Sequence, residues 1–258
     1  MKRKMHSISL LDDSYPVKTV ITDREDWQCH SGWRDEDSRK TIIEAYLHTP
    51  LKRVLYAHET HSASVISVLD DDSAAPLEKI SEDCRIGPSG GYDAMVTSVP
   101  GILLCVWTAD CIPLFLYDTA KHAAAIAHCG WKGICSGITE NTLDVMGRRF
   151  GSSPANLLAA FGPGICADCY EVGSELIEAF SARFSREELG ELFRPKENGK
   201  YLLDLRQAIV MELIRAGIEP SNIFDTGICS YESDRFASYR RDGRSVPCRQ
   251  TLSGIVLL

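Results

Sequence analysis

The middle of the chain constrains the fold most, because three apolar segments follow one another there with only short turns between them. Ile102–Thr108 carries no charged residue, which is typical of a buried strand. Leu114–Tyr117 follows Pro113, and Ala123–His128 follows the turn Asp118-Thr-Ala-Lys. The last two segments therefore predict a β-hairpin beside a third buried strand.

Helical patterns alternate with strands on both sides of this region. We expect helices at residues 38–48, 137–150, 173–184, 186–193 and 204–216, and further strands at 54–56, 63–69, 95–98, 157–161 and 255–258. The polar stretch at about 21–42 is interpreted as irregular surface. Interleaved helices and hairpins favour a mixed-sheet, layered α/β domain over a simple doubly wound fold. A length of 258 residues fits one such domain, residues 1–258.

Charge and composition exclude several classes of protein. Against 28 Lys and Arg stand 36 Asp and Glu, a net charge of -8, so a nucleic-acid or membrane-surface binder is disfavoured. The longest apolar run, residues 102–107, is far shorter than the roughly 20 residues that span a bilayer. No apolar segment follows the basic Met1-Lys-Arg-Lys, so we expect a cytoplasmic protein whose ten cysteines are reduced.

Three side chains suggest a metal site. A hairpin turn centred between Thr119 and Ala120 would pair Cys111 directly with His128, with Cβ atoms about 4.5–5.5 Å apart. His61 would be the third ligand. Two imidazoles and one thiolate suit zinc, and three protein ligands leave a fourth position open, as in catalytic sites.

Other interpretations remain open at this point. His58 competes with His61, and spacing does not bring either close to the hairpin. Cys111 and His128 would also serve as a nucleophile–base pair in a cysteine hydrolase, with Asp110 or Asp93 orienting the base. Cys166-x-x-Cys169 would suit a redox pair or half a zinc knuckle. No second Cys or His pair has matching spacing, so the plainer interpretation is two ordinary thiols.

Several motifs occur in an order that is specific to one family. They are Asp93-Ala-Met-Val-Thr97, Thr108-Ala-Asp-Cys-Ile-Pro113, His128-Cys-Gly-Trp-Lys-Gly133, Gly162-Pro-Gly-Ile165 with Tyr170-Glu-Val-Gly173, and Ser238-Tyr-Arg-Arg-Asp-Gly243. With His61, this set resembles the YfiH family, whose members are called multicopper polyphenol oxidases, laccase-domain proteins and purine nucleoside phosphorylases. The resemblance covers about residues 54–250.

The resemblance implies a fold similar to the catalytic domain of cytotoxic necrotizing factor and a metal, usually zinc with copper possible, at His61, Cys111 and His128. It implies phosphorolysis of adenosine, inosine, guanosine and methylthioadenosine, with adenosine deamination beside it. Asp110 would orient a ligand or relay a proton. The expected partners are a purine nucleoside and phosphate, and the chain would be a monomer or weak homo-oligomer.

Substrate residues follow from the same motifs. Arg240 and Arg241 would clamp phosphate, because guanidinium binds oxyanions in a bidentate fork. Tyr239 lies in the same motif, and Trp131 would stack on the nucleoside or belong to the apolar core.

The chain also departs from the family pattern. The N-terminal segment of about 50 residues lacks the Arg-Gly-Gly-type loop, Glu59 replaces a common Gln, Lys132 replaces Arg, and residues 244–249 replace Thr-Gly-Arg. Three alternatives stay open: a copper-dependent phenol oxidase, a Cys–His hydrolase acting on peptidoglycan precursors, and a non-catalytic zinc-stabilised module. The oxidase is disfavoured because the whole chain has 7 histidines.

Overall fold

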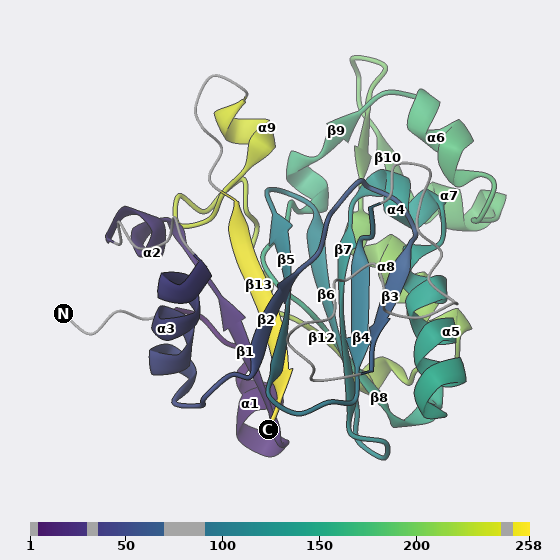
Figure 1. Ribbon diagram of the computed structural model, residues 1–258. Coiled ribbons are helices and arrows are strands. Elements are labelled where there is room, and N and C mark those ends of the chain that lie inside the picture. Colours follow the sequence, from purple (N-terminus) through teal and green to yellow (C-terminus); the bar gives the residue numbers. More distant parts are fainter. Residues whose placement is uncertain (1–4, 30–35, 70–90, 244–249) are drawn as a thin grey trace.

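The computed structural model describes residues 5–29, 36–69, 91–243 and 250–258, and two sheets packed against each other form its centre (Figure 1). Apolar side chains such as Leu104, Phe115 and Ile126 fill the space between the sheets and are fully buried. Helices cover the outer face of each sheet, so the layers run helix, sheet, sheet, helix. The mixed, layered α/β fold is confirmed.

The smaller of the two sheets has four strands and includes both ends of the chain. Its strand order is β1 (Val17–Ile21), β13 (Thr251–Leu257), β5 (Ile102–Thr108) and β2 (Arg53–Tyr56). Helix α3 (Glu36–Leu47) packs on its outer face, and α1 (Ser9–Ser14) and α2 (Arg24–Cys29) flank β1.

The sequence did not predict strand β1. The polar stretch that follows it was interpreted as irregular surface, but it contains helix α2. Lys18 and Thr19 interrupt the apolar pattern of β1, but Val17 and Val20 are buried. All five residues of β1 pair with β13, more than 230 residues away in sequence. The divergent N-terminal segment is therefore part of the sheet, and its first strand depends on a partner that local sequence does not reveal.

The larger sheet has six strands. Their order is β12 (Ile223–Asp225), β8 (Leu157–Phe161), β6 (Ile112–Asp118), β7 (Ala123–Cys129), β4 (Ala94–Thr97) and β3 (Val65–Val68). Its outer face packs against α4 (Trp131–Cys135), α5 (Ile138–Phe150) and α8 (Leu205–Arg215). Parallel and antiparallel pairs occur in the same sheet, because β3–β4 and β8–β12 are parallel and the other pairs antiparallel.

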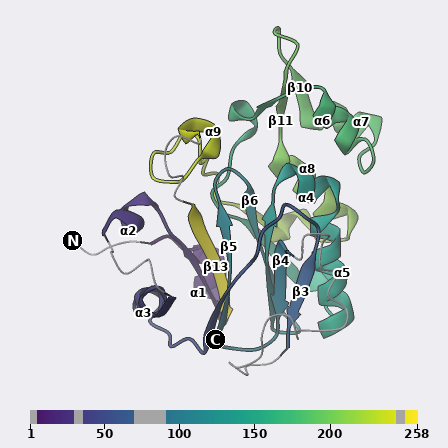
Figure 2. The same ribbon diagram turned by 45° about the horizontal axis from the view of Figure 1, so that its top comes forward.

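A third, small sheet extends beyond the main body and carries one rim of the site (Figure 2). It consists of β10 (Phe193–Pro195), β11 (Tyr201–Leu203) and β9 (Glu171–Val172). Two short helices, α6 (Glu175–Phe180) and α7 (Arg186–Leu192), lie beside it, so the helix predicted at 173–184 is shorter than expected. Helix α9 (Tyr239–Asp242) lies near the start of β13.

The register predicted for the central hairpin is wrong by two residues. His128 lies opposite Pro113, not opposite Cys111, because the turn is centred one residue later than expected. Pro113 is accommodated as the second residue of β6, where its carbonyl accepts a hydrogen bond from the Gly162 N–H. A two-residue shift preserves the alternation of faces, so Cys111 and His128 still lie on one face as diagonal neighbours.

The other strands and helices predicted around the hairpin are confirmed with shifts of a few residues at their ends. The sequence Asp70-Asp-Asp-Ser is typical of a loop, but it lies outside the described residues, as does the substituted segment 244–249. The seven cysteines whose side chains are described are all free thiols. No helix in the described ranges is long and apolar enough to cross a membrane.

Candidate metal centre and its pocket

Cys111 and His128 reach one point from the two strands of the central hairpin. Cys111 immediately precedes β6, and His128 is the second-to-last residue of β7. Just before the thiol, Asp110 has a φ of 92°, a left-handed conformation that non-glycine residues seldom adopt. Such strain persists only where surrounding contacts impose it, and it concentrates at functional sites.

His61 is delivered by the loop between β2 and β3, and Asp93 holds that loop in place. The Asp93 carboxylate accepts hydrogen bonds from the backbone N–H groups of Thr60, His61 and Ser62 at 3.1, 2.9 and 2.7 Å. His61 itself has a φ of 57°. The hydrogen bonds from three backbone amides to one buried carboxylate thus hold His61 in its left-handed conformation.

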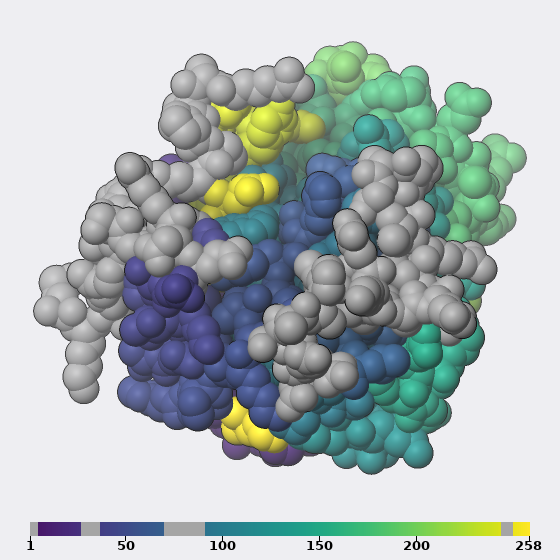
Figure 3. Space-filling model, viewed as in Figure 1, coloured from purple at the N-terminus to yellow at the C-terminus, as the bar shows by residue number. Residues whose placement is uncertain are grey.

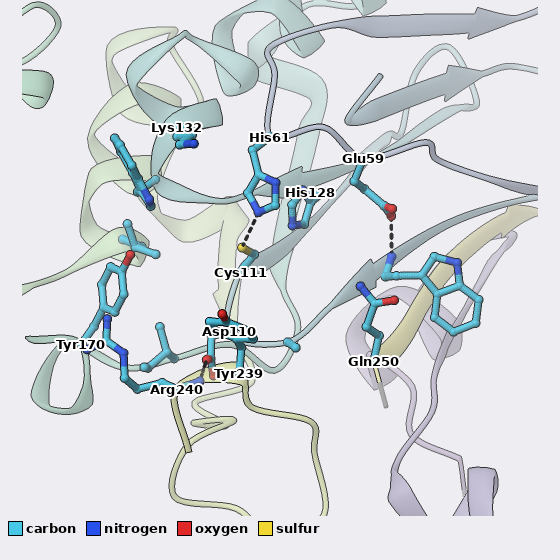
Figure 4. Close-up of a pocket in the computed structure, with 15 residues that line it drawn as sticks. Glu59, His61, Asp110, Cys111, His128, Lys132, Tyr170, Tyr239, Arg240 and Gln250 are labelled. Atoms are coloured by element: carbon cyan, nitrogen blue, oxygen red, sulfur yellow. Dashed lines mark hydrogen bonds between the residues drawn. The ribbon is translucent and has the colours of Figure 1, made fainter. Parts of the chain in front are cut away.

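The three side chains form one cluster, with their ligand atoms all within 4.8 Å of one another (Figure 4). The Cys111 Sγ lies 4.0 Å from the His61 Nε2, and the two imidazole rings meet edge to face. Bonds of about 2.0–2.3 Å to a tetrahedral zinc ion place neighbouring donors roughly 3.3–3.8 Å apart. The donor set therefore fits zinc after small side-chain movements.

Gly130 makes room for this cluster. A Cβ at this position would lie 2.9 Å from the Cys111 Sγ and 3.0 Å from the His61 Cδ2. The residue has an ordinary φ of -85°, so its backbone conformation does not require glycine. The requirement is space beside the thiol and the imidazole.

Electrostatics favour a thiolate at Cys111. Burial alone would raise the pKa of Cys111, but the charge of His128 and hydrogen bonds from both imidazoles lower it to about 6. Burial alone would lower the pKa of His128, but the Cys111 thiolate and the Asp93 carboxylate raise it to about 10. The His128 Nδ1 lies 2.8 Å from Asp93, which leaves the Nε2 side of the ring for a ligand bond.

The exposure of the three donors increases in steps toward a cavity. His128 is buried, Cys111 half-buried and His61 exposed. The cavity has a volume of about 700 Å³. Its lining residues are Glu59, His61, Trp107, Ala109, Asp110, Cys111, His128, Trp131, Lys132, Ile165, Tyr170, Leu205, Tyr239, Arg240 and Gln250. The cluster is thus open on one side, as a site that admits a substrate must be.

Asp110 joins the cluster to the C-terminal wall of this cavity. Its carboxylate accepts a 2.8 Å hydrogen bond from the Ser230 hydroxyl and a 2.6 Å bond from the Arg240 backbone N–H. These contacts hold its unusual backbone conformation and position α9. On the face seen in Figure 3, C-terminal residues lie directly beside the central strands.

Arg240, Tyr239 and Trp131 line the cavity, as does Lys132. The Arg240 guanidinium lies 4.9 Å from the centre of the Tyr170 ring, and its Nη1 donates to the Glu171 carbonyl. Within the described residues this is the only hydrogen bond of the guanidinium, so its remaining N–H groups are available to an anion.

Arg241, which was expected to clamp phosphate, does not line the cavity, and its guanidinium is bonded to backbone carbonyls instead. Its Nη1 donates to the carbonyls of Ser230, Tyr231 and Ser233, and its Nη2 donates to that of Phe236. An ion pair with Asp242 uses its Nε. The guanidinium therefore holds together the loop at residues 230–236. The motif that contains Arg241 did not indicate this role.

Sequence reasoning also left some site residues unassigned. Asp93 entered only as one of two groups that would orient His128, whereas it also holds the His61 loop. Tyr170 belonged to one of the family motifs, but no role was predicted for it. Glu59 accepts a 2.7 Å hydrogen bond from the Trp107 N–H, and burial raises its pKa. His58 is exposed, is not part of the cluster and pairs with Tyr92 through its backbone, so it does not compete with His61.

The fold and the site together define a mixed α/β protein with an open His₂Cys cluster at the end of a central hairpin. The chain belongs to the family described as multi-copper polyphenol oxidoreductase laccase, whose sequence model matches residues 28–254. The family predicted from the motifs is therefore confirmed.

Relatives named as enzymes of purine metabolism align with most of the chain. It is 35% identical over 221 residues to "Adenosine deaminase RL5" from an unknown prokaryotic organism, covering 85% of this chain and 80% of that protein. It is 37% identical over 201 residues to a purine nucleoside phosphorylase of Bacteroides thetaiotaomicron, covering 77% and 71%. The crystal structure of the Bacillus licheniformis hypothetical protein YfiH superposes with a TM-score of 0.77 at 27% identity, over 94% and 93% of the chains.

Proposed function

We propose that this chain is a zinc-dependent purine nucleoside phosphorylase. The observation that carries the proposal is the open His61–Cys111–His128 cluster facing a cavity with two cationic side chains, Lys132 and Arg240. The named activities of its relatives support the substrate class. We further propose that residues 1–258 form one domain that works in the cytoplasm as a monomer or weak homo-oligomer.

Zinc fits the donor set better than copper. Two imidazoles and one thiolate are a typical zinc set, and the buried Asp93 fixes the tautomer of His128. A multicopper oxidase needs more histidines than the two in this cluster. When bound by these three side chains, zinc would supply a Lewis acid beside the cavity.

Arg240 would bind phosphate. Stacking on Tyr170 and the bond to the Glu171 carbonyl hold its guanidinium, so little side-chain entropy remains to be lost on binding. In the proposed reaction a phosphate oxygen forms a bond to C1′ of the ribose while the C1′–N9 bond breaks. The electron pair of that bond passes to the purine, which takes up a proton from solvent, and ribose 1-phosphate is the second product.

The purine would lie against aromatic walls. Trp131 packs half-buried against the core and also lines the cavity, and Trp107 and Tyr170 line it as well. Flat apolar surfaces of this kind bind a purine by stacking. Lys132 lies 5.6 Å from the centre of the Trp131 ring, beside the same wall.

Adenosine deamination is the second activity that we propose, and the 35% identical adenosine deaminase supports it. In this reaction water adds to C6 of the purine and ammonia leaves, which converts adenosine to inosine. Phosphorolysis and deamination would use the same open cluster, and phosphate would favour phosphorolysis.

The proposal is tested by incubating zinc-loaded protein with adenosine, with and without phosphate, and separating the products by chromatography. We expect adenine and ribose 1-phosphate only with phosphate, and inosine under both conditions. Cys111→Ala should abolish all products. Cys135→Ala is the matched control, because Cys135 is a half-buried thiol that does not line the cavity.

Three results would contradict the proposal. Well-folded, zinc-loaded protein that releases neither adenine nor inosine would exclude it. Metal-free protein that hydrolyses an amide substrate through Cys111 would favour the cysteine hydrolase. Copper-dependent oxidation of phenols would favour the oxidase.

A further inference from the structure

A second cluster of thiols lies outside the cavity and has no part in the proposed reaction. Its members are Cys166, Cys169, Cys229 and Glu232, and their ligand atoms all lie within 4.8 Å of one another. We propose that these four side chains bind a structural zinc ion that joins two segments of the chain.

The two segments present their ligands with the same spacing. Cys166 directly precedes the 3₁₀ turn Ala167–Cys169 and Cys169 is its last residue, and Cys229 and Glu232 are likewise three residues apart. Paired ligands from two such turns are the usual construction of a structural zinc site. A Cys–Glu pair does not match a pattern that requires two Cys or His ligands, so the sequence pattern does not reveal this second pair.

Backbone contacts hold the two turns together without disulfides. A parallel bridge links Gly164 to Cys229, and the Ser230 N–H donates to the Gly164 carbonyl. The backbone N–H of Cys166 donates to the Cys229 Sγ at 3.3 Å, a contact that favours a thiolate. The Cys169 Sγ lies 3.7 Å from a Glu232 carboxylate oxygen, close to the spacing of neighbouring donors around zinc.

Burial and exposure suit a structural role. Cys229 is buried, Cys166 and Cys169 are half-buried, and Glu232 is exposed and closes the outer side. All four positions would be filled by protein, which leaves no open position for a substrate, unlike the His₂Cys cluster.

The ion would stabilise the wall of the catalytic cavity. Ser230, next to Cys229, donates to the Asp110 carboxylate, and Ile165, next to Cys166, donates its N–H to the Asp110 carbonyl. Tyr170, next to Cys169, carries the ring on which Arg240 stacks. Each thiol is therefore one residue from a group that positions Asp110 or Arg240.

Zinc content measured on full-length, zinc-loaded and desalted protein tests this inference. We expect two zinc ions per chain in the wild type and one in Cys169→Ala, with a lower Tm for the variant. His61→Ala should also retain one, and combining it with Cys169→Ala should leave none. Cys135→Ala, the control thiol, should retain two. Because Cys169 is only half-buried and Glu232 is exposed, Cys169→Ala and Glu232→Gln should fold even where a variant of the buried Cys229 does not.

The outcomes separate this site from the catalytic one. A single zinc ion lost in His61→Ala but kept in Cys169→Ala would overturn the inference, as would a disulfide among these thiols in protein purified under reducing conditions. A single ion lost in Cys169→Ala but kept in His61→Ala would support this site and contradict the proposed catalytic centre.

Discussion

Replacing Asp93 by asparagine should weaken zinc binding, although it changes none of the three side chains that would bind the ion. The buried carboxylate accepts five hydrogen bonds at 3.1 Å or less: one from the ring of His128 and four from the loop that carries His61. Asparagine has one acceptor oxygen. Its amide nitrogen would face N–H groups that need an acceptor, and the negative charge opposite His128 would be lost.

The size of the effect follows from these contacts. A hydrogen bond to a charged group contributes about 1.5–3 kcal/mol, and such contributions do not add fully within one network. Loss of the carboxylate should lower the free energy of unfolding by about 3–5 kcal/mol, the range found when one partner of a buried pair is removed. Zinc affinity should fall about 10- to 100-fold, as it does when the group that orients a ligand imidazole is lost.

Competition of the protein with a chromophoric chelator measures the zinc affinity, and urea unfolding measures the stability. Asp118→Asn is the matched control, because Asp118 is also buried but its carboxylate caps the turn at the far end of β6. Its zinc affinity should stay within about twofold of wild type. If Asp93→Asn binds zinc as tightly as the wild type, or both variants lose affinity equally, the orienting role of Asp93 is wrong.

Three further changes test the site and the N-terminal segment. Gly130→Ala should lower zinc occupancy measured by elemental analysis, because its Cβ would lie 2.9 Å from the Cys111 Sγ. Arg240→Met should raise the KM for phosphate about 10- to 100-fold in the phosphorolysis assay, the equivalent of losing about 1.5–3 kcal/mol of charged hydrogen bonding. Burial raises the pKa of Asp23, but hydrogen bonds from the Arg235 guanidinium and other donors outweigh burial. The pKa in the folded state is therefore below that in the unfolded state. The stabilisation is thus present above the unfolded pKa of about 3.9 and is lost as pH falls through the folded pKa, and Asp23→Asn should flatten the acid limb of unfolding curves.

Gly147→Ala lies in α5 with space for a methyl group and should keep its zinc; equal loss in both glycine variants would refute the steric reasoning. Arg148→Met removes a charge from the exposed side of the same helix and should leave the KM unchanged. An Asp23→Asn variant with the same acid limb as the wild type would show that the carboxylate does not titrate with folding.

The proximity of Cys111 and His128 was predictable from sequence because side chains alternate along strands. The hairpin register was wrong by two residues, yet Cys111 and His128 stayed on one face, since the period of a strand is two. His61 was placed by the resemblance, because its position depends on a left-handed φ and on the distant carboxylate of Asp93.

The features that the sequence did not predict depend on contacts between segments of the chain. Arg241 sits beside Arg240 in the sequence, but its guanidinium points to the carbonyls of a preceding loop, which no local pattern reports. Strand β1 escaped notice because its pairing partner is the last strand of the chain. Cys166 and Cys169 have no second Cys or His pair in the sequence, and the side chains that the fold brings close to them are Cys229 and Glu232.

We propose that an ion held by His61, Cys111 and His128 is needed for the reaction on purine nucleosides. The most direct test is to titrate metal-free protein with zinc and to measure phosphate-dependent release of adenine from adenosine at each step. The rate should be absent without metal, rise with zinc until the cluster is filled, and stay absent at every zinc concentration in His61→Ala. Full turnover by metal-free protein, or a wild-type rate in zinc-saturated His61→Ala, would show that the reaction does not need this ion.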